Sequence, residues 1–360
     1  MDDVRRTLSR ERRFAARAVR HPRVIATRAK RIVSARTLYL ERNHDTDKTL
    51  MLVGSGRSGS TWLGEILVEI FACRMIFEPL HRHRVPLARA VPWGYFAEPG
   101  DSDPDLAAVM GRIVSGRVRG WATDIYNTRR FPRRRLVKDI RATNLLPWLH
   151  ARFPEVPIVY LLRHPVPAAW SATELGWDPS LGEFLGQRRL VDGPLAPWRE
   201  VIAGHDAGGD IFESHVLRWC LENVVPIGWL APGSVHVVFY EDLVEDPAGE
   251  LGRLARYLER FTAGGWAFDP ATPLALDRRS QADWRRPPAL PSGRGIESWL
   301  AAVPARRVTG AVALVKEFGL DRLYDASPRP RVGPDEVLIG GQRPPQAEVP
   351  GSGSESSNSR

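Results

Sequence analysis

The feature that most limits how this chain can fold is a glycine-rich segment, GSGRSG at 54–59, between two apolar patterns. The five residues before it, TLMLV at 49–53, form a short apolar run and predict a buried strand. The residues after it repeat apolar side chains at helical spacing: Trp62, Leu63, Ile66, Leu67, Ile70 and Phe71. A strand, a glycine loop and a helix N-terminus in this order predict a phosphate site, because the unpaired amides and the helix dipole favour anions. The alternative to a phosphate site is a tight turn in which the glycines serve only the backbone conformation.

The loop fits a dinucleotide-binding template. Its glycines match G-x-G-x-x-G, and Glu78 follows about twenty residues later at a predicted strand end. In that template an acid at this distance binds a ribose hydroxyl of the cofactor. An oxidoreductase that uses an NAD-type cofactor is therefore one hypothesis for this sequence.

The loop also fits G-x-x-x-x-G followed by Ser60 and Thr61, which is a nucleotide-binding loop with serine in place of its lysine. In nucleotide triphosphatases that lysine reaches the terminal phosphates, so its loss argues against an ATP-dependent kinase. The cation stands at Arg57, inside the loop. An arginine there suits a 5′-phosphate with a second oxyanion beside it better than it suits a dinucleotide turn.

The rest of the chain alternates strand and helix patterns. Further strands are predicted at 75–77, 136–138, 157–162 and 235–240, and helices at 217–230, 248–257 and 305–318. Solid apolar strands separated by helices predict an α/β fold, with a mainly parallel central sheet flanked by helices on both faces. The stretch 81–135 is rich in Pro, Gly and Arg and is expected to be an irregular insertion near the site.

The two ends differ from the middle and set the expected domain boundaries. Residues 1–43 are strongly basic and lack the apolar stretch of a signal peptide, and helical spacing within 24–33 predicts an amphipathic helix. We expect this arm to be a solvated helix packed on the domain; contact with an anionic membrane surface is the competing hypothesis. Residues 44–326 form the expected domain, and 327–360 read as a disordered tail.

Composition narrows the class of ligand. The chain has 51 Lys and Arg against 42 Asp and Glu, so its partners are expected to be anionic. No nucleic-acid motif accompanies the charge. No apolar run approaches the roughly 18 residues that span a bilayer. Two cysteines, Cys73 and Cys220, are too few for a disulfide framework or a zinc site and fit a reducing compartment such as the cytoplasm.

Two motifs together resemble sulfotransferases that use PAPS (3′-phosphoadenosine 5′-phosphosulfate). RSGSTW at 57–62 is similar to their 5′-phosphosulfate loop. IVYLLRHP at 158–165, with Ser171 eight residues after Arg163, is similar to their 3′-phosphate site. The stretch from Tyr240 to Pro247 and the final Trp299 to Tyr324 also look family-like, and we interpret the first as structural. The resemblance implies a P-loop-like three-layer sandwich.

The resemblance also implies roles for residues of the loop and of the second motif. The 5′-phosphate would be held by Ser58, Gly59, Ser60 and Thr61, and the 3′-phosphate by Arg163 and Ser171. Gly56 and Arg57 would also belong to the PAPS-binding residues. Trp62 would stack on the adenine, with a place in the helix core as the alternative. PAP would be the product, and no metal is expected, because the phosphosulfate carries less charge than a triphosphate terminus.

For the transfer step, Arg57 would stabilise the leaving oxygen and Lys138 would contact the sulfuryl group. Glu78 is the preferred base, since tyrosylprotein and bacterial glycolipid types use a glutamate in a similar place. Such a role would need a pKa raised by partial burial. The histidine of the steroid and phenol type is replaced here by Ile140. His81, His83 and Asp139 are the alternative bases.

The acceptor follows less directly from the sequence. A small molecule, a carbohydrate or a glycolipid is expected from the resemblance, together with the basic run of Arg129, Arg130, Arg133, Arg134 and Arg135. A solvated loop is the alternative for that run. A nucleotide-binding interaction protein at a membrane surface is the non-enzyme hypothesis, and the oligomeric state is not predicted.

Overall fold

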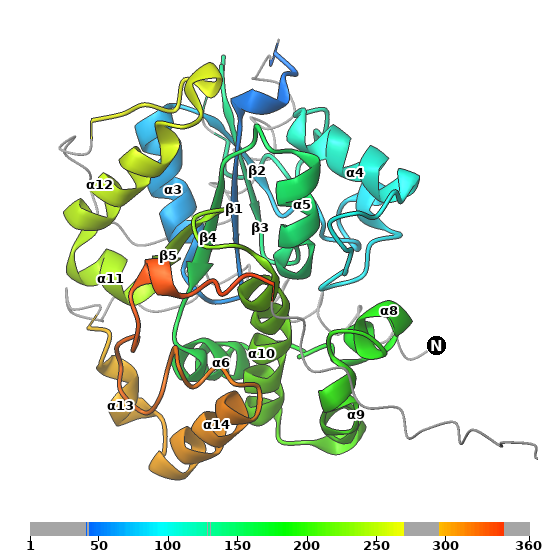
Figure 1. The fold of residues 1–360 in the computed structure, drawn as a ribbon, viewed down its shortest axis with the longest axis vertical. Helices are drawn as coiled ribbons and strands as arrows, with labels where there is room; N and C mark the ends of the chain where they lie inside the picture. The colour runs from blue at the N-terminus through cyan, green and yellow to red at the C-terminus, as the bar shows by residue number, and fades with distance from the viewer. Residues whose placement is uncertain (1–40, 42, 128, 130, 270–294, 342–360) are drawn as a thin grey trace, which may run out of the picture.

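A computed structural model describes residues 41, 43–127, 129, 131–269 and 295–341 of the chain. Its centre is one sheet of five strands that all run parallel, in the order β2-β3-β1-β4-β5 (Figure 1). The strands are β1 (Thr49–Gly54), β2 (Arg74–Phe77), β3 (Arg135–Asp139), β4 (Ile158–Leu162) and β5 (His236–Phe239). The α/β class and the strand positions expected from the sequence are confirmed.

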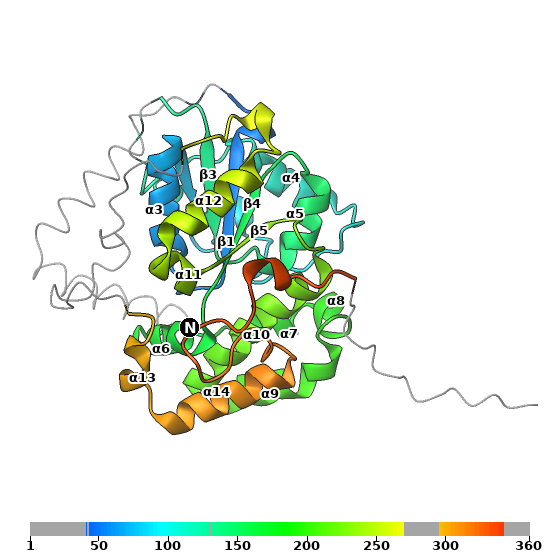
Figure 2. The same cartoon turned by 60° about the vertical axis from the view of Figure 1, so that its left-hand side comes forward.

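Helices cover both faces of this sheet, so the molecule has three layers (Figures 1 and 2). One face carries α3 (Ser60–Phe71), α11 (Tyr240–Glu245) and α12 (Pro247–Leu258), and the other carries α4 (Pro104–Val114) and α5 (Leu146–Arg152). Alternate residues of β1 enter the two cores: Leu50 and Leu52 join one, Met51 and Val53 the other. Because a strand turns successive side chains to opposite faces, an entirely apolar strand fits only a sheet covered on both sides.

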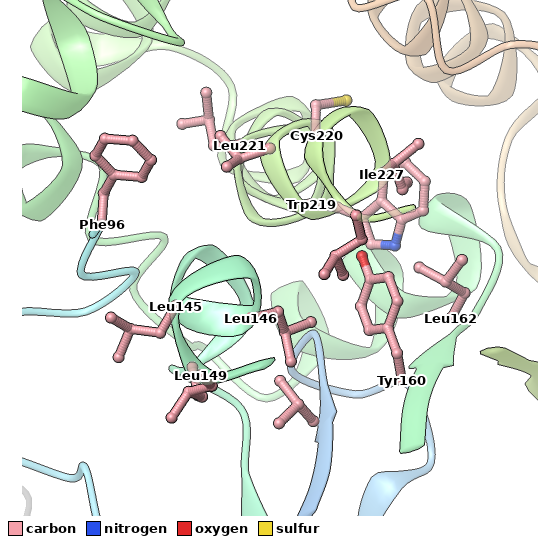
Figure 3. Close-up of a cluster of buried hydrophobic side chains, with 14 of the residues drawn as sticks. Phe96, Leu145, Leu146, Leu149, Tyr160, Leu162, Trp219, Cys220, Leu221 and Ile227 are labelled. Atoms are coloured by element: carbon pink, nitrogen blue, oxygen red, sulfur yellow. The ribbon is translucent and has the colours of Figure 1, made fainter. Parts of the chain in front are cut away.

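A group of helices packs beyond one end of the sheet (Figure 2). It contains α6 (Pro165–Glu174), α7 (Gly182–Leu185), α8 (Arg188–Val191), α9 (Arg199–Gly208), α10 (Ile211–Trp229), α13 (Ser298–Ala302) and α14 (Ala305–Glu317). The long helix α10 joins this group to the larger core, where Trp219 and Ile227 lie near Tyr160 of β4 (Figure 3). Asp210 caps α10 by accepting from the amides of Phe212 and Glu213, which starts the helix earlier than the predicted residue 217.

The strand order bears on the dinucleotide hypothesis. In the doubly wound dinucleotide fold β1 lies beside β2, so that the acid at the end of β2 reaches the ribose. Here β3 lies between β1 and β2. Glu78, which follows β2, is therefore one strand further from the glycine loop than that fold requires, and the topology does not support an NAD-type site.

Two expectations about irregular segments differ from the structure. The expected insertion 81–135 contains helix α4, capped by Asp103 and packed through Leu106, Met110 and Ile113. Residues 327–341, expected in the tail, instead pack on the domain: Val337 and Leu338 are buried, and the amide of Gly340 donates to the carbonyl of Leu230.

The amphipathic helix expected within 24–33 and the tail from 342 onward lie outside the described residues. Within the described ranges, no helix has both the length and the apolar character that crossing a bilayer requires.

Candidate functional site

The candidate residues gather at one edge of the sheet because each follows, or ends, a parallel strand. Arg57 follows β1, Glu78 follows β2, Lys138 lies near the end of β3, Arg163 follows β4 and Tyr240 follows β5. Ligands of open α/β sheets bind outside the carboxyl ends of the strands. The topology alone therefore brings together residues that are up to 183 positions apart in the sequence.

The glycine loop has the shape that a phosphate cradle needs. Gly59, the N-cap of α3, has a φ of 93°, and a Cβ there would lie 2.6 Å from the ring of Tyr240. Arg57 also has a positive φ, 68°, which is uncommon for a residue with a side chain. Ser58 closes the turn, since its hydroxyl donates to the carbonyl of Ser55 at 2.6 Å. With glycine at the N-cap, no capping side chain competes for the first amides of α3, and these can bind an anion.

Helix α10 holds this loop through a hydrogen bond. The side-chain amide of Asn223 donates to the hydroxyl of Ser55 at 3.0 Å, and the Tyr160 hydroxyl donates to the amide oxygen of Asn223 at 2.5 Å. Both Tyr160 and Asn223 are fully buried. The sequence analysis missed this support, because an asparagine in the middle of a predicted helix gives no signal that it contacts a loop 168 residues away.

The two motifs that carry the resemblance meet in space. The Nε of Arg57 donates to the hydroxyl of Ser171 on α6 at 3.0 Å. An Nη of Arg163 donates to the main-chain carbonyl of Arg57 at 2.9 Å, and its guanidinium lies 4.2 Å from the ring centre of Tyr240. The Nε of Arg163 is buried and has no hydrogen-bond partner in the described part of the chain. Two guanidinium groups, one with a buried donor still unsatisfied, therefore face a helix N-terminus, which suits a ligand with more than one oxyanion.

A second cationic cluster surrounds Glu78. One carboxylate oxygen accepts from Lys138 Nζ at 2.8 Å and the other from an Nη of Arg141 at 2.9 Å. Burial raises the pKa of Glu78, but the two neighbouring cations outweigh burial and hold the pKa well below its ordinary value. The raised pKa expected for a base is thus wrong, because the pKa of Glu78 is shifted in the opposite direction. Arg141 was not foreseen, although it stands only three residues after Lys138.

Glu78 has a strained backbone conformation. Its φ is 45°, and its amide donates to the carbonyl of Lys138 at 2.7 Å. The side chain of Ile140, just beyond β3, lies 3.7 Å from the position that a Cβ on Gly56 would occupy. Non-glycine residues in this region of φ and ψ concentrate at functional sites, where the surrounding fold imposes the conformation.

The alternative bases have different surroundings. Asp139 is buried, which raises its pKa, but its oxygens accept from the amides of Leu80 and Arg141 at 2.7 and 2.8 Å. That geometry makes Asp139 a brace for the backbone. Burial and the charge of Arg141 lower the pKa of His81 to about 4, so its ring is neutral at pH 7. His83 is exposed.

Two further expectations concern Trp62 and the segment that begins at Tyr240. Trp62 is buried in the core between the sheet and α3, with its ring 5.9 Å from that of Tyr240, so the core alternative describes its place in the structure.

The carboxylate of Glu241 accepts from the amide of His164 and from the hydroxyl of Tyr324, each at 3.0 Å. Glu241 thus joins β4, β5 and the C-terminal part of the domain, and the structural interpretation of this segment is confirmed.

A comparison with protein families identifies the family of this chain. Residues 49–261, more than half of the chain, match the model of a sulfotransferase family. The chain therefore belongs to the sulfotransferase family. No curated protein matches the sequence.

Among solved structures, the chain is similar to mouse sulfotransferase SULT7A1 complexed with PAP, with 15% identity over 80% of this chain and 88% of that one and a TM-score of 0.35. It is also similar to the sulfotransferase domain of the Synechococcus PCC 7002 olefin synthase, with 16% identity over 78% and 98% and a TM-score of 0.37. A third match is retinol dehydratase in complex with androsterone and PAP, with 15% identity over 80% and 84% and a TM-score of 0.36.

Proposed function

We propose that this protein transfers a sulfuryl group from PAPS to a hydroxyl or amine of an acceptor and releases PAP. The observation that carries the proposal is the contact of Arg57 with both Ser171 and Arg163, which joins two motifs more than a hundred residues apart. Membership of the sulfotransferase family supports it. The NAD-type alternative has no comparable support, because the strand order separates Glu78 from the loop.

The residues present fit PAPS on three counts. The first amides of α3, with Ser58, Ser60 and Thr61, would hold the 5′-phosphate. Arg163, whose buried Nε lacks a partner among the described residues, and Ser171 would hold the 3′-phosphate. Gly56 and Gly59 would keep the loop in this shape, since a Cβ at Gly56 would collide with Trp177 and one at Gly59 with Tyr240. The buried Trp62 would shape the wall near the nucleotide rather than present an open face.

PAPS would supply an activated sulfuryl group whose leaving oxygen belongs to a phosphate. The acceptor oxygen forms a bond to sulfur while the bond from sulfur to the bridging oxygen breaks, and the electron pair remains on the phosphate of PAP. Arg57 would stabilise the charge that grows on that oxygen, and Lys138 would bind the sulfuryl oxygens. Positioned cations of this kind perform for sulfuryl transfer what they perform for phosphoryl transfer, and no metal is part of the proposal.

Glu78 would receive the proton that the acceptor loses. Its low pKa makes it a weak base in the free protein but keeps it ionised at every physiological pH. When a sulfuryl group binds Lys138, that cation is shared, its hold on Glu78 weakens, and the pKa of Glu78 rises towards the value that suits a base. His81, neutral at pH 7, is the second candidate for this role.

The remaining parts of the proposal concern the acceptor and the location. We keep a carbohydrate, glycolipid or other small hydroxyl compound as the acceptor class, and a cytoplasmic location, which the buried free thiols of Cys73 and Cys220 support. Peripheral contact with an anionic membrane through residues 1–43 stays a hypothesis, which liposome flotation of the full chain against a chain lacking them would test.

Transfer of labelled sulfate from PAPS tests the proposed function. A cell extract supplies acceptors, and the labelled product is separated and identified. We expect product to form without Mg²⁺ and to vanish with the Arg57→Ala variant, which should lose turnover far more than affinity for PAP. Binding of PAP with no transfer of label to any acceptor would contradict the proposal and favour a nucleotide-binding protein that is not an enzyme.

A further inference from the structure

The two oxygens of the Glu78 carboxylate are held by two different cations. Oε1 accepts from Lys138 Nζ at 2.8 Å, and Oε2 accepts from an Nη of Arg141 at 2.9 Å. Lys138 belongs to β3 and pairs in register with Leu52 of β1, the strand that leads into the glycine loop. Arg141 stands beyond the end of β3. Because each oxygen has its own partner, the two cations can perform separate tasks.

Arg141 is fixed at both its backbone and its side chain. Its amide donates to Asp139 at 2.8 Å, and its guanidinium lies 4.0 Å from the ring centre of Trp93. The other oxygen of Asp139 accepts from the amide of Leu80 at 2.7 Å, which ties the segment after Glu78 to the segment after β3. A planar guanidinium that stacks on an indole and is 7% exposed has little freedom to move.

Trp93 is itself held by the helices that pack beyond the end of the sheet. Its main-chain amide donates to Glu183 of α7 at 2.6 Å, and its indole nitrogen donates to Glu222 of α10 at 2.8 Å. Glu222 also accepts from Arg218 Nε at 2.9 Å, and the Arg218 guanidinium lies 3.7 Å from the Trp93 ring centre. The ring on which Arg141 packs is therefore anchored to two helices.

Lys138 is held more loosely than Arg141. Its Nζ donates to Glu78 and lies 4.7 Å from the ring centre of Phe77. An ammonium on a flexible four-carbon stem can exchange one oxygen for another by rotation of the side chain. A sulfuryl group bound to Lys138 would therefore release Oε1 of Glu78, whereas Oε2 would stay on Arg141.

The charges around Glu78 show why one cation has to stay. The Glu78 side chain is 13% exposed, and its burial raises the pKa that Lys138 and Arg141 together lower. Two further titratable groups face it: Asp139, which carries a like charge, and His81, whose ring is neutral at pH 7. Once a sulfuryl group shares Lys138, Arg141 is the remaining cation among these groups. Without it, burial would keep Glu78 protonated near neutral pH and unable to accept a proton.

We propose that Arg141 is a positioning residue of the transfer reaction, which holds Oε2 of Glu78 against the Trp93 support while Oε1 receives the proton of the acceptor. The acceptor oxygen bonds to sulfur as its proton moves to Oε1, and the electron pair of the broken bond from sulfur to the bridging oxygen stays on PAP. Arg141 acts through Glu78 and keeps it ionised while the donor is bound. This inference rests on the proposed function.

The pH dependence of labelled-sulfate transfer tests this role, with saturating PAPS and a heat-treated cell extract as the source of acceptor. Glu78 has to be ionised, so the rate should fall on the acid side of its pKa in the donor complex. Arg141→Met should lower the rate about 10²-fold at pH 7 and move this acid limb up by about one to three pH units. Part of the loss should be regained at pH 9. A loss that is equal at every pH would indicate a merely structural role and overturn the proposal.

Two more variants separate the charge of Arg141 from its support. Arg141→Lys keeps a cation, so its acid limb should stay where the native one lies. Trp93→Leu keeps both cations and should lower the rate about three- to tenfold with an unmoved acid limb. An acid limb that moves as far in Arg141→Lys as in Arg141→Met, or a native rate in Trp93→Leu, would refute the assignment.

The matched control is Arg307→Met. Arg307 also pairs with a carboxylate, that of Asp210 at 3.5 Å, and its guanidinium lies 5.7 Å from the ring centre of Trp170. Its rate and pH dependence should equal those of the native protein. Titration with PAP should give native affinity for every variant, which shows that each one is folded. Absence of transfer by the native protein would instead refute the proposed function.

Discussion

Replacing Glu78 by glutamine perturbs the transfer site at the point where two cations share one carboxylate. Glutamine keeps the shape and can still accept one hydrogen bond, but it removes the negative charge from between Lys138 and Arg141. Lys138 is 2% exposed, so water cannot replace the lost partner. Breaking a buried ion pair of this kind costs about 3 kcal/mol of unfolding free energy.

The same substitution should reduce the rate of transfer by about 10²- to 10⁴-fold, the range for the loss of a general base. Affinity for PAP should change little, because Glu78 contacts no residue of the glycine loop by hydrogen bond or ion pair among those described. Labelled-sulfate transfer, calorimetric titration with PAP and urea unfolding measure the three quantities. Glu259→Gln, at the exposed C-cap of α12, is the control. Transfer at the native rate in the Glu78 variant would refute this reasoning.

The low pKa of Glu78 adds a check on the sign of the pH dependence. Since the folded-state pKa lies below the ordinary value of 4.5, the ion pairs stabilise the fold above that pH and are lost only in stronger acid. The difference in unfolding free energy between the native protein and the Glu78→Gln variant should therefore be constant from pH 8 to 5 and shrink below 4.5. A difference that already shrinks at pH 6 would contradict the assigned pKa.

Three further perturbations have defined outcomes. Gly59→Ala would force a side chain against Tyr240 at a positive φ, so we expect the free energy of unfolding to fall by about 1–3 kcal/mol. Titration with PAP should show a lower affinity, and an unchanged affinity would argue against a phosphate site at the glycine loop. Glu41→Gln leaves the buried Arg74 and Arg135 short of a carboxylate and should cost about 3 kcal/mol in urea unfolding, whereas a cost below 1 kcal/mol would contradict that role. Burial lowers the pKa of His236 to about 3, so acidification from pH 7 to 5 should lower the free energy of unfolding of the native protein by about 2 kcal/mol more than that of the His236→Asn variant. The same dependence of the unfolding free energy on pH in both proteins would contradict this.

The strands could be predicted because both faces of the sheet are buried. Residues such as Met51 and Leu52 must then both be apolar, which leaves an unbroken apolar run in the sequence. Helix α4 was missed in a region judged by its proline and glycine content, although Asp103 before Pro104 is a helix-start signal. The packing of Val337 and Leu338 could not be foreseen, since two apolar residues in a polar segment do not indicate which surface they cover.

The sequence predicts the residues of the proposed phosphate site better than it predicts the side chains that surround them. Loop and strand-end motifs mark Arg57 and Arg163, because local backbone geometry decides where they point. The pKa of Glu78 depends on which strand lies beside β2, and the position of Arg141 follows from that neighbour. Arg218 and Asn223 lie inside a helix whose sequence gives no sign of the face that turns towards the loop. Such contacts arise only from the tertiary arrangement.

Calorimetric titration with PAP and with adenosine 5′-monophosphate, both without Mg²⁺, measures what the phosphate on the ribose contributes. The account predicts that PAP binds at least tenfold tighter in the native protein, and that Arg163→Met brings its affinity close to that of the monophosphate. Equal affinities in the native protein, or a preference for PAP that survives the loss of the Arg163 guanidinium, would contradict the account.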